Sequence, residues 1–186
     1  MKDIRFLWPI VFIVTSLGAR SWELRRKFAA DSGTIVAPWS FRYLVTVGTG
    51  SVLLCLAEYL IRGVPPRNLW ISAAGALLGA LTFALRGASR KALDRMWSVH
   101  VEIRERHILV QGGPYARIRH PIYLAAIMEV VAAAMLLNAW IGGIVGLAAT
   151  CAVLSRRIKI EEQAMEAKFG DVWREYRRRT GALWPT

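Results

Sequence analysis

Residues 121–154 read PIYLAAIMEVVAAAMLLNAWIGGIVGLAATCAVL, and this stretch decides the fold of the chain. Its single charged residue is Glu129, and Asn138-Ala139 divides it into apolar segments over 122–137 and 140–154. Segments this apolar predict helices inside a membrane, where a helix satisfies its own backbone hydrogen bonds. A connection of two residues predicts that these helices form a tight antiparallel hairpin.

The rest of the chain is apolar in the same way. Of its 186 residues 55% are hydrophobic, and the mean hydropathy of +0.35 is high for a water-soluble domain. Further apolar segments lie over 6–19, 43–61 and 69–85. A membrane span needs ~20 residues, so the shorter segments must tilt or include flanking residues. We predict an all-α integral membrane protein with about five transmembrane helices, the first three within residues 1–90.

Basic residues are concentrated on one side of the predicted spans. The net charge is +12, and 21 of the 25 Lys and Arg residues fall in the alternate segments 20–42, 86–119 and 156–179. By the positive-inside rule these segments are cytoplasmic, which leaves the N-terminus outside and the C-terminal tail inside. Basic residues that border apolar runs favour contact with the lipid bilayer, so we expect no nucleic-acid partner. A cleaved N-terminal signal, suggested by Leu17-Gly18-Ala19, is the less favoured interpretation.

Residues 113–123, GPYARIRHPIY, place polar groups directly before the hairpin. Pro121 suits the first turn of a helix, so Arg119 and His120 lie beside free backbone N–H groups, a setting that binds anions. The alternative is that Arg119 anchors the topology and that His120 only starts the helix.

Two tyrosines, Tyr115 and Tyr123, flank this trio. Their rings can stack on a purine or attract a sulfonium through a cation–π contact. Tyrosines of the aromatic belt at the membrane surface would have the same positions, so spacing alone leaves both interpretations open.

Arg157, Glu161 and Glu162 form a second polar cluster, just after the apolar segment 140–154. Arg157 and Glu161 are four residues apart and share one face of a helix. Their position predicts the same membrane boundary as His120, so the two clusters can form one site. An ordinary intrahelical ion pair on a solvated face is the alternative.

Two glutamates, Glu58 and Glu129, lie inside apolar segments. An ionisable group in the membrane indicates function, and Glu129 is placed to line a substrate path; the alternative is a pairing with an arginine or a donor on a neighbouring helix. We interpret Cys55 and Cys151 as small buried apolar residues. His100 and His107 have no zinc-like spacing with cysteines, so we expect no metal.

Shorter elements follow from local patterns. Residues 99–103 and 107–110 are suited to short extended pieces. The tail over 157–178 has the pattern of an amphipathic helix, interrupted at Phe169-Gly170 and restarted with Asp171 as an N-cap. The chain has no Rossmann glycine pattern and no Walker loop, so a soluble-type methyltransferase or dehydrogenase domain is not expected.

A set of motifs in one order resembles the isoprenylcysteine carboxyl methyltransferase family, which is itself similar to the membrane phospholipid N-methyltransferases. The resemblance covers about residues 95–185, roughly half of the chain. The motifs are His107-Ile108-Leu109-Val110, Gly113-Pro114-Tyr115, Arg119-His120-Pro121-Ile122-Tyr123, Arg157 with Glu161-Glu162, and Phe169-Gly170 with Tyr176.

The resemblance implies a membrane enzyme that uses S-adenosylmethionine, releases S-adenosylhomocysteine, and has its core in residues 91–186. Arg157 and Arg119 would be catalytic, with Arg157 facing the acceptor and Glu129 also placed near it. The implied cofactor contacts are His107, Ile108, Leu109, Val110, Tyr115, His120, Pro121, Ile122, Tyr123, Glu161 and Glu162.

The expected methyl acceptor is hydrophobic or lipid-like and enters laterally from the membrane. A carboxylate acceptor is already ionised at neutral pH and needs no base, which favours carboxyl O-methylation. An amine of a phospholipid or a small thiol would need to lose a proton, and Glu129 or His120 are candidates to accept it. A membrane reductase that uses NADPH and a non-enzymatic membrane protein are the remaining alternatives. The compact length suggests a prokaryotic inner-membrane protein.

Overall fold

The computed structural model describes residues 11, 13–15, 18, 34–62, 68–98, 102–103 and 107–185. Most of the predicted first segment, 6–19, lies outside these residues, as do residues 63–67 and 99–101. The positions of segment 6–19 that are described, including Val11 and Ile13, are helical.

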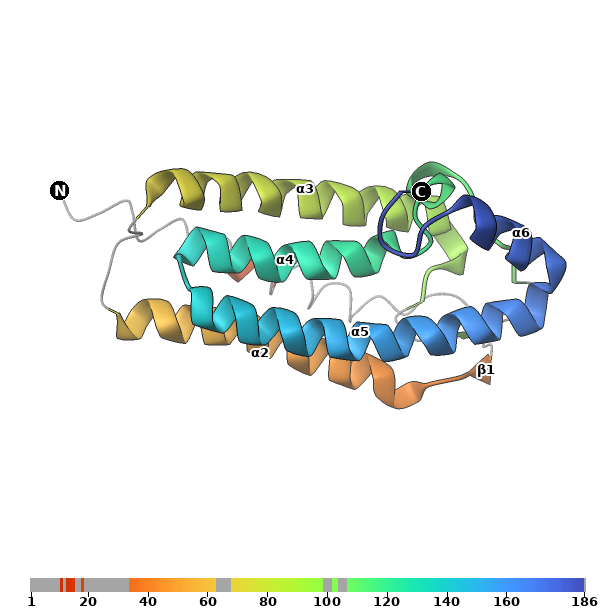
Figure 1. Ribbon diagram of the computed structural model, residues 1–186, viewed down its shortest axis with the longest axis horizontal. Helices are drawn as coiled ribbons and strands as arrows, with labels where there is room; N and C mark the ends of the chain where they lie inside the picture. Colours follow the sequence, from red (N-terminus) through yellow and green to blue (C-terminus); the bar gives the residue numbers. More distant parts are fainter. Residues whose placement is uncertain are drawn as a thin grey trace. The chain divides into compact units, whose positions relative to one another are not determined.

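The described part of the chain is almost entirely helical (Figure 1). Its α-helices are α2 (Pro38–Ile61), α3 (Leu69–Leu93), α4 (Pro121–Leu137), α5 (Trp140–Phe169) and α6 (Asp171–Arg179). By length and composition α2, α3 and α5 can each cross a membrane, whereas α4 is apolar but has only 17 residues. The prediction of an all-α membrane protein is therefore confirmed.

The boundaries of the helices have local causes. The Asn68 side chain accepts hydrogen bonds from the backbone N–H groups of Trp70 (3.0 Å) and Ile71 (3.2 Å), which is an N-cap for α3. Asn138 has φ 51°, a left-handed conformation that asparagine tolerates, and its side-chain amide donates to the Ser72 hydroxyl at 2.8 Å. The turn at Asn138-Ala139 thus joins α4 to α5 as the predicted hairpin.

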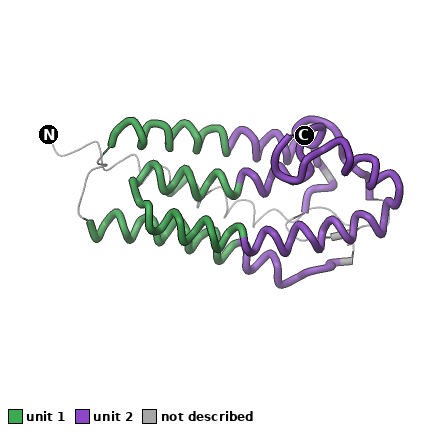
Figure 2. Tube along the Cα trace, viewed as in Figure 1, with its two compact units in different colours: residues 1–27, 45–82, 126–151 green, residues 28–44, 83–125, 152–186 purple. Residues whose placement is uncertain are grey.

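The chain forms two compact units, each assembled from three separate pieces (Figure 2). Unit 1 comprises residues 1–27, 45–82 and 126–151, and unit 2 comprises residues 28–44, 83–125 and 152–186. Helices α2 to α5 each contribute residues to both units. The sequence predicts three transmembrane helices in residues 1–90 and the methyltransferase core in residues 91–186. This division by function stays a prediction.

Unit 1 is held together by small residues that let helices approach closely. Its buried clusters include Val52, Cys55, Ala132, Ala133 and Ala134. Small residues at contacts between membrane helices allow the backbones to come near one another, which increases van der Waals attraction. The prediction for the cysteines is half right, because Cys55 is buried whereas Cys151 is exposed on α5.

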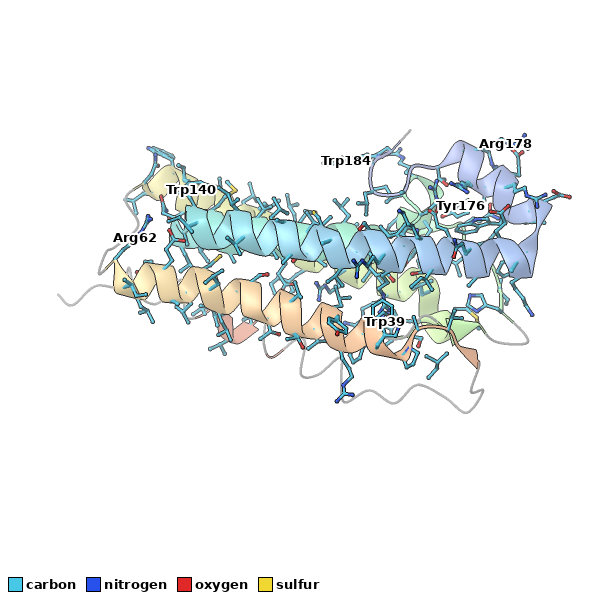
Figure 3. All side chains as sticks on the ribbon, turned by 60° about the horizontal axis from the view of Figure 1, so that its bottom comes forward. Trp39, Arg62, Trp140, Tyr176, Arg178 and Trp184 are labelled. Carbon is cyan, nitrogen blue, oxygen red and sulfur yellow. The ribbon has the colours of Figure 1, made fainter. Side chains whose placement is uncertain are left out.

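Glu58 has a structural explanation in unit 1. Its carboxylate accepts the backbone N–H of Gly142 at 2.7 Å, in the first turn of α5, and pairs with Arg62 at 3.1 Å. Figure 3 shows Arg62 and Trp140 at the same end of the paired helices. A carboxylate at a helix N-terminus is favourable because it satisfies a free N–H and opposes the positive end of the helix dipole. The alternative reading of Glu58, a pairing with an arginine, is confirmed.

Unit 2 contains the charged ends of the helices and their connections. Here β1 (Thr34–Ile35) pairs antiparallel with β2 (Glu102–Ile103), so part of the predicted extended piece 99–103 is a strand. Residues 107–110, also predicted to be extended, belong to no strand. Asp171 is the first residue of α6 and the N-cap is Gly170, which has φ 54°. Asp171 instead pairs with Arg174 at 2.7 Å, so the predicted N-cap role is wrong.

Substitution of Gly142 by alanine should destabilise the protein. A methyl group there would lie 2.9 Å from the backbone nitrogen of Cys55, and backbone atoms cannot move aside like a flexible side chain. We expect Gly142→Ala to lower the free energy of unfolding by about 1–3 kcal/mol, the usual cost of overpacking. Thermal unfolding in detergent measures this.

Gly50→Ala is the matched control in the same unit, because a methyl group at Gly50 meets nothing within 4 Å. It should leave the melting temperature unchanged or slightly raised. Equal losses for the two variants would contradict the close packing of α5 on α2.

Candidate active site

A cavity of about 110 Å³ in unit 2 collects most of the predicted cofactor residues. Its wall comes from the end of α3, the loop before α4, the second half of α5 and one face of α6. Eight of its residues were predicted from the sequence: His107, Ile108, Leu109, Val110, Tyr115, Arg119, His120 and Glu161. Segments more than 40 residues apart therefore meet around one space, as the two-cluster hypothesis requires.

The loop before α4 is fixed by backbone pairing with the chain that follows α6. The N–H of Arg119 donates to the carbonyl of Gly181 at 2.9 Å, and that of His120 donates to the carbonyl of Ala182 at 3.0 Å. Earlier in the loop, Gly113 has φ 60° and opens a 3-10 turn, η3 (Gly113–Ala116). Glycine tolerates this conformation without a steric cost, which lets the chain turn toward the cavity.

The Arg119 side chain joins three segments. Its Nε lies 2.8 Å from Glu162 Oε1, and its Nη1 donates to the backbone carbonyls of Arg177, at 3.2 Å, and Thr180. Only 8% of the side chain is exposed. A guanidinium has several donors in a rigid plane, so it can hold a carboxylate and two carbonyls together. Arg119 therefore connects the start of α4 to α5 and to the end of α6.

His120 is buried and oriented by a carboxylate. Its Nε2 lies 3.2 Å from Glu162 Oε1, and its ring stacks on Tyr123 with centroids 5.3 Å apart. An ionised carboxylate only accepts hydrogen bonds, so Nε2 carries the proton in this pair. Nδ1 is 3.9 Å from Glu161 Oε1, beyond hydrogen-bond distance. The His120 ring thus presents Nδ1 toward the Glu161 side of the site.

Glu162 is ionised because its partners outweigh its burial. Burial acts to raise the pKa of this carboxyl group, but hydrogen bonds from His120 and Arg119, and the charge of Arg119, lower it from 4.5 to about 2. Glu162 does not line the cavity. Its function in the structure is to hold Arg119 and His120 in place.

Arg157 does not line this cavity, and its contact with the acceptor stays a prediction. Only 4% of the residue is exposed. Its Nε donates to the Tyr123 hydroxyl at 2.6 Å, and its Nη1 donates to the Ser40 hydroxyl at 2.8 Å. The Tyr123 hydroxyl in turn donates to Glu161 Oε2 at 2.5 Å. Arg157 thus reaches the cavity through Tyr123 and Glu161.

The remaining predicted residues do not line the cavity. Pro121 and Ile122 begin α4 without lining it. Of the residues that do line it, Ile108 is 65% exposed. Glu129 is buried in α4 and belongs to unit 1. In the part of the chain that the structure describes, no three side chains of His, Cys, Asp or Glu are grouped to hold a metal ion.

Sequence reasoning missed the contribution of α6. Trp173 and Tyr176 line the cavity and are 2% and 3% exposed, and Figure 3 places Tyr176 on the side of α6 that faces α5. Tyr176 donates to the carbonyl of Tyr115 at 2.7 Å. The Trp173 indole N–H is buried and has no acceptor among the described residues. The signal was an aromatic pair spaced three apart in a helix whose other residues, apart from Val172, are charged.

The two cavity tyrosines are neutral at physiological pH. Burial, then the negative charge of Glu161, raises the pKa of Tyr115 above its ordinary value. Burial also raises the pKa of Tyr176 to about 12, although Arg119 acts in the opposite direction. Neither phenol can therefore accept a proton from a ligand. The cavity offers neutral hydroxyl and indole groups, the imidazoles of His107 and His120, the Arg119 guanidinium, the Glu161 carboxylate and an apolar wall.

The sequence of this region has a known counterpart. A sequence model of the isoprenylcysteine carboxyl methyltransferase (ICMT) family matches residues 76–167. Residues 76–167 belong to the ICMT family. The ICMT region contains Arg119, His120 and Glu161, whereas α6 follows it.

Two bacterial proteins are similar over longer stretches. The uncharacterized protein YpbQ of Bacillus subtilis is 25% identical over 126 residues, which are 68% of this chain and 74% of that protein. The cobalt-zinc-cadmium resistance protein CzcN of Cupriavidus metallidurans is 26% identical over 106 residues, or 56% of this chain. That match spans 49% of CzcN, about half of its length.

Glu162→Gln should lower the folding stability of the protein, and the size of this loss should depend on pH. Because folding lowers the pKa of Glu162, its contribution to stability is fully present above pH 4.5 and is lost as the pH falls toward 2. We expect the wild type to melt at a higher temperature than Glu162→Gln at pH 7, and the difference to shrink below pH 4.5. Melting curves in detergent across this range measure it.

Glu175→Gln is the control, since Glu175 is half exposed and pairs only with exposed arginines, Arg178 and Arg179, among the described residues. Such a pair contributes about 0–1 kcal/mol. A difference between wild type and Glu162→Gln that stayed constant down to pH 2 would contradict the assignment.

Proposed function

We propose that this chain is an integral membrane methyltransferase that uses S-adenosylmethionine and methylates the carboxylate of a lipid-like acceptor, in the manner of isoprenylcysteine carboxyl methylation. The observation that carries the proposal is the meeting of Tyr115, His120 and Glu161 at one cavity within the ICMT region. These residues come from a loop and a helix more than 40 positions apart, so their meeting reflects the fold rather than local sequence.

The residues around the cavity suit S-adenosylmethionine. When bound, this cofactor supplies an electrophilic methyl group on a positively charged sulfur. Glu161 provides negative charge and can accept hydrogen bonds from amino or hydroxyl groups, and the buried Trp173 indole N–H supports a ligand because it still requires an acceptor. Leu93, Met96 and Leu109 provide apolar surface.

The cavity is smaller than the ~300–1,000 Å³ of typical small-molecule sites. Binding of the whole cofactor therefore requires the wall to move or part of the ligand to remain at the mouth. Because Ile108 is exposed on this wall, the loop 107–110 is the segment that we propose to adjust.

The neutral tyrosines support a carboxylate as the acceptor. Methyl transfer from a sulfonium depends on alignment, and an acceptor that is already ionised needs no base. Tyr115 and Tyr176 have raised pKa values and cannot serve as bases at neutral pH. A phospholipid amine or a small thiol would need a proton acceptor such as His120, and these remain the alternative acceptors.

We assign Arg157 and Arg119 positioning roles. Arg157 holds the Tyr123 hydroxyl, which holds Glu161, while Arg119 holds Glu162, which holds His120. Direct binding of the acceptor by Arg157 would require its guanidinium to leave Tyr123 and Ser40. Glu129 stays a candidate for the acceptor path.

The distribution of basic residues supports a cytoplasmic site, with the N-terminus outside and the tail inside. The bacterial relatives fit a prokaryotic inner membrane as the location. The apolar part of the acceptor would enter laterally from the bilayer.

Binding of S-adenosylhomocysteine to purified protein tests the cofactor. We expect Glu161→Gln and His120→Ala each to weaken binding 10-fold or more in calorimetric titrations, because each removes a polar group at the cavity. Glu166→Gln, on the same helix but not at the cavity, should bind like the wild type. Binding of NADPH in place of S-adenosylhomocysteine would contradict the proposal.

Methyl transfer tests the acceptor. The protein is incubated with S-adenosylmethionine labelled in its methyl group and with three acceptors: a prenylated cysteine with a free carboxylate, a phospholipid with a primary amine, and a small thiol. We expect base-labile label, typical of a methyl ester, on the carboxylate. Label on the amine or thiol alone would overturn the carboxylate assignment and leave the cofactor assignment intact.

A further inference from the structure

A second cavity in unit 2 lies between the start of α2 and the middle of α5. Its volume is about 550 Å³, and its wall is formed by Trp39 and Tyr43 of α2 and by Ala152, Val153 and Arg156 of α5. It shares no residue with the cavity of the candidate active site. Four of the five lining residues are apolar or aromatic, and the fifth is a cation.

The residues of both walls of this second cavity, an open groove, lie at the predicted level of the membrane surface. On α5 the apolar segment ends at Leu154, and Arg156 follows two residues later. On α2 the apolar segment begins at Tyr43, one turn after Trp39. Two independent helices therefore place the groove where hydrocarbon gives way to headgroups, the position in which Trp and Tyr are favoured.

The aromatic side chains form a defined wall. Trp39 and Tyr43 contact edge to face, with ring centroids 5.7 Å apart, and both remain substantially exposed. Figure 3 shows Trp39 on the first part of α2. An edge-to-face pair is a favourable arrangement that keeps both rings in place. The groove therefore has a wall that exists before a ligand binds.

No described carboxylate pairs with the charge of Arg156, and the residue is exposed. This differs from the neighbouring Arg157, which is buried and bonded to Tyr123 and Ser40. A cation next to an apolar groove at the headgroup level is complementary to an anion with an attached hydrocarbon chain.

We propose that this groove binds one acidic phospholipid of the bilayer, with the phosphate on Arg156 and an acyl chain along Ala152, Val153 and the two aromatic rings. A soluble anion would gain nothing from the apolar wall, and a zwitterionic lipid would gain less from Arg156 because its own cation offsets the charge of its phosphate. The proposal does not depend on methyl transfer, because the two cavities share no residue.

Native mass spectrometry of the protein in neutral detergent tests the proposal. Phosphatidylglycerol and phosphatidylcholine with identical acyl chains are titrated separately, and the apparent affinity for the first bound lipid is compared. One basic residue at the membrane surface corresponds to about a fivefold preference for an anionic lipid. We expect wild type to prefer phosphatidylglycerol about fivefold, and Arg156→Gln to bind the two lipids equally.

Lys159→Gln removes the same charge from an exposed position of α5 outside the groove, so it should keep the preference. Ala152→Phe fills the groove and leaves Arg156 in place, and it should weaken binding of both lipids. Equal binding of both lipids by wild type, an equal loss in Arg156→Gln and Lys159→Gln, or unchanged binding in Ala152→Phe would each overturn the proposal. Melting temperatures of all three variants equal to that of the wild type would show that they remain folded.

Discussion

The candidate site depends on one partly buried carboxylate. Glu162 Oε1 accepts from Arg119 Nε and His120 Nε2, and these are successive residues just before α4. An arginine and a histidine together offset the cost of burying the charge, which an isolated carboxylate could not do. Because Arg119 also holds two carbonyls near the end of α6, this single ion pair ties a loop and two helices to each other.

A second chain of contacts gives the site its other fixed point. Ser40 of α2, Arg157 of α5, Tyr123 of α4 and Glu161 of α5 are joined in sequence by hydrogen bonds. The two chains meet at the stacked rings of His120 and Tyr123. Each polar group in them has a partner, which is the condition under which a buried polar network orders a site.

The sequence predicted the helical hairpin and the two polar clusters, but it did not predict the partners of every site residue. Apolar runs and the Asn138 turn predicted the hairpin. A chain inside a membrane must satisfy its backbone hydrogen bonds internally, which favours helices. Because Arg119–Tyr123 and Arg157–Glu162 each adjoin an apolar segment, the sequence also predicted that both clusters lie at the same membrane boundary. It could not give the partners of Arg157, since Ser40 lies 117 positions away. Nor could it give the inward face of α6, because six of the nine residues of that helix are charged and the burial of Trp173 and Tyr176 is a tertiary effect.

The backbone pairing of Arg119 and His120 with Gly181 and Ala182 has a consequence for biosynthesis. The ribosome makes α4 and α5 before it reaches residues 181–182, so the hairpin enters the membrane while the loop before it still lacks these partners. Water must satisfy the two N–H groups during that interval. The loop that lines the candidate-site cavity can therefore take its final pairing only after residues 181–182 have been made, later than both helices of the hairpin.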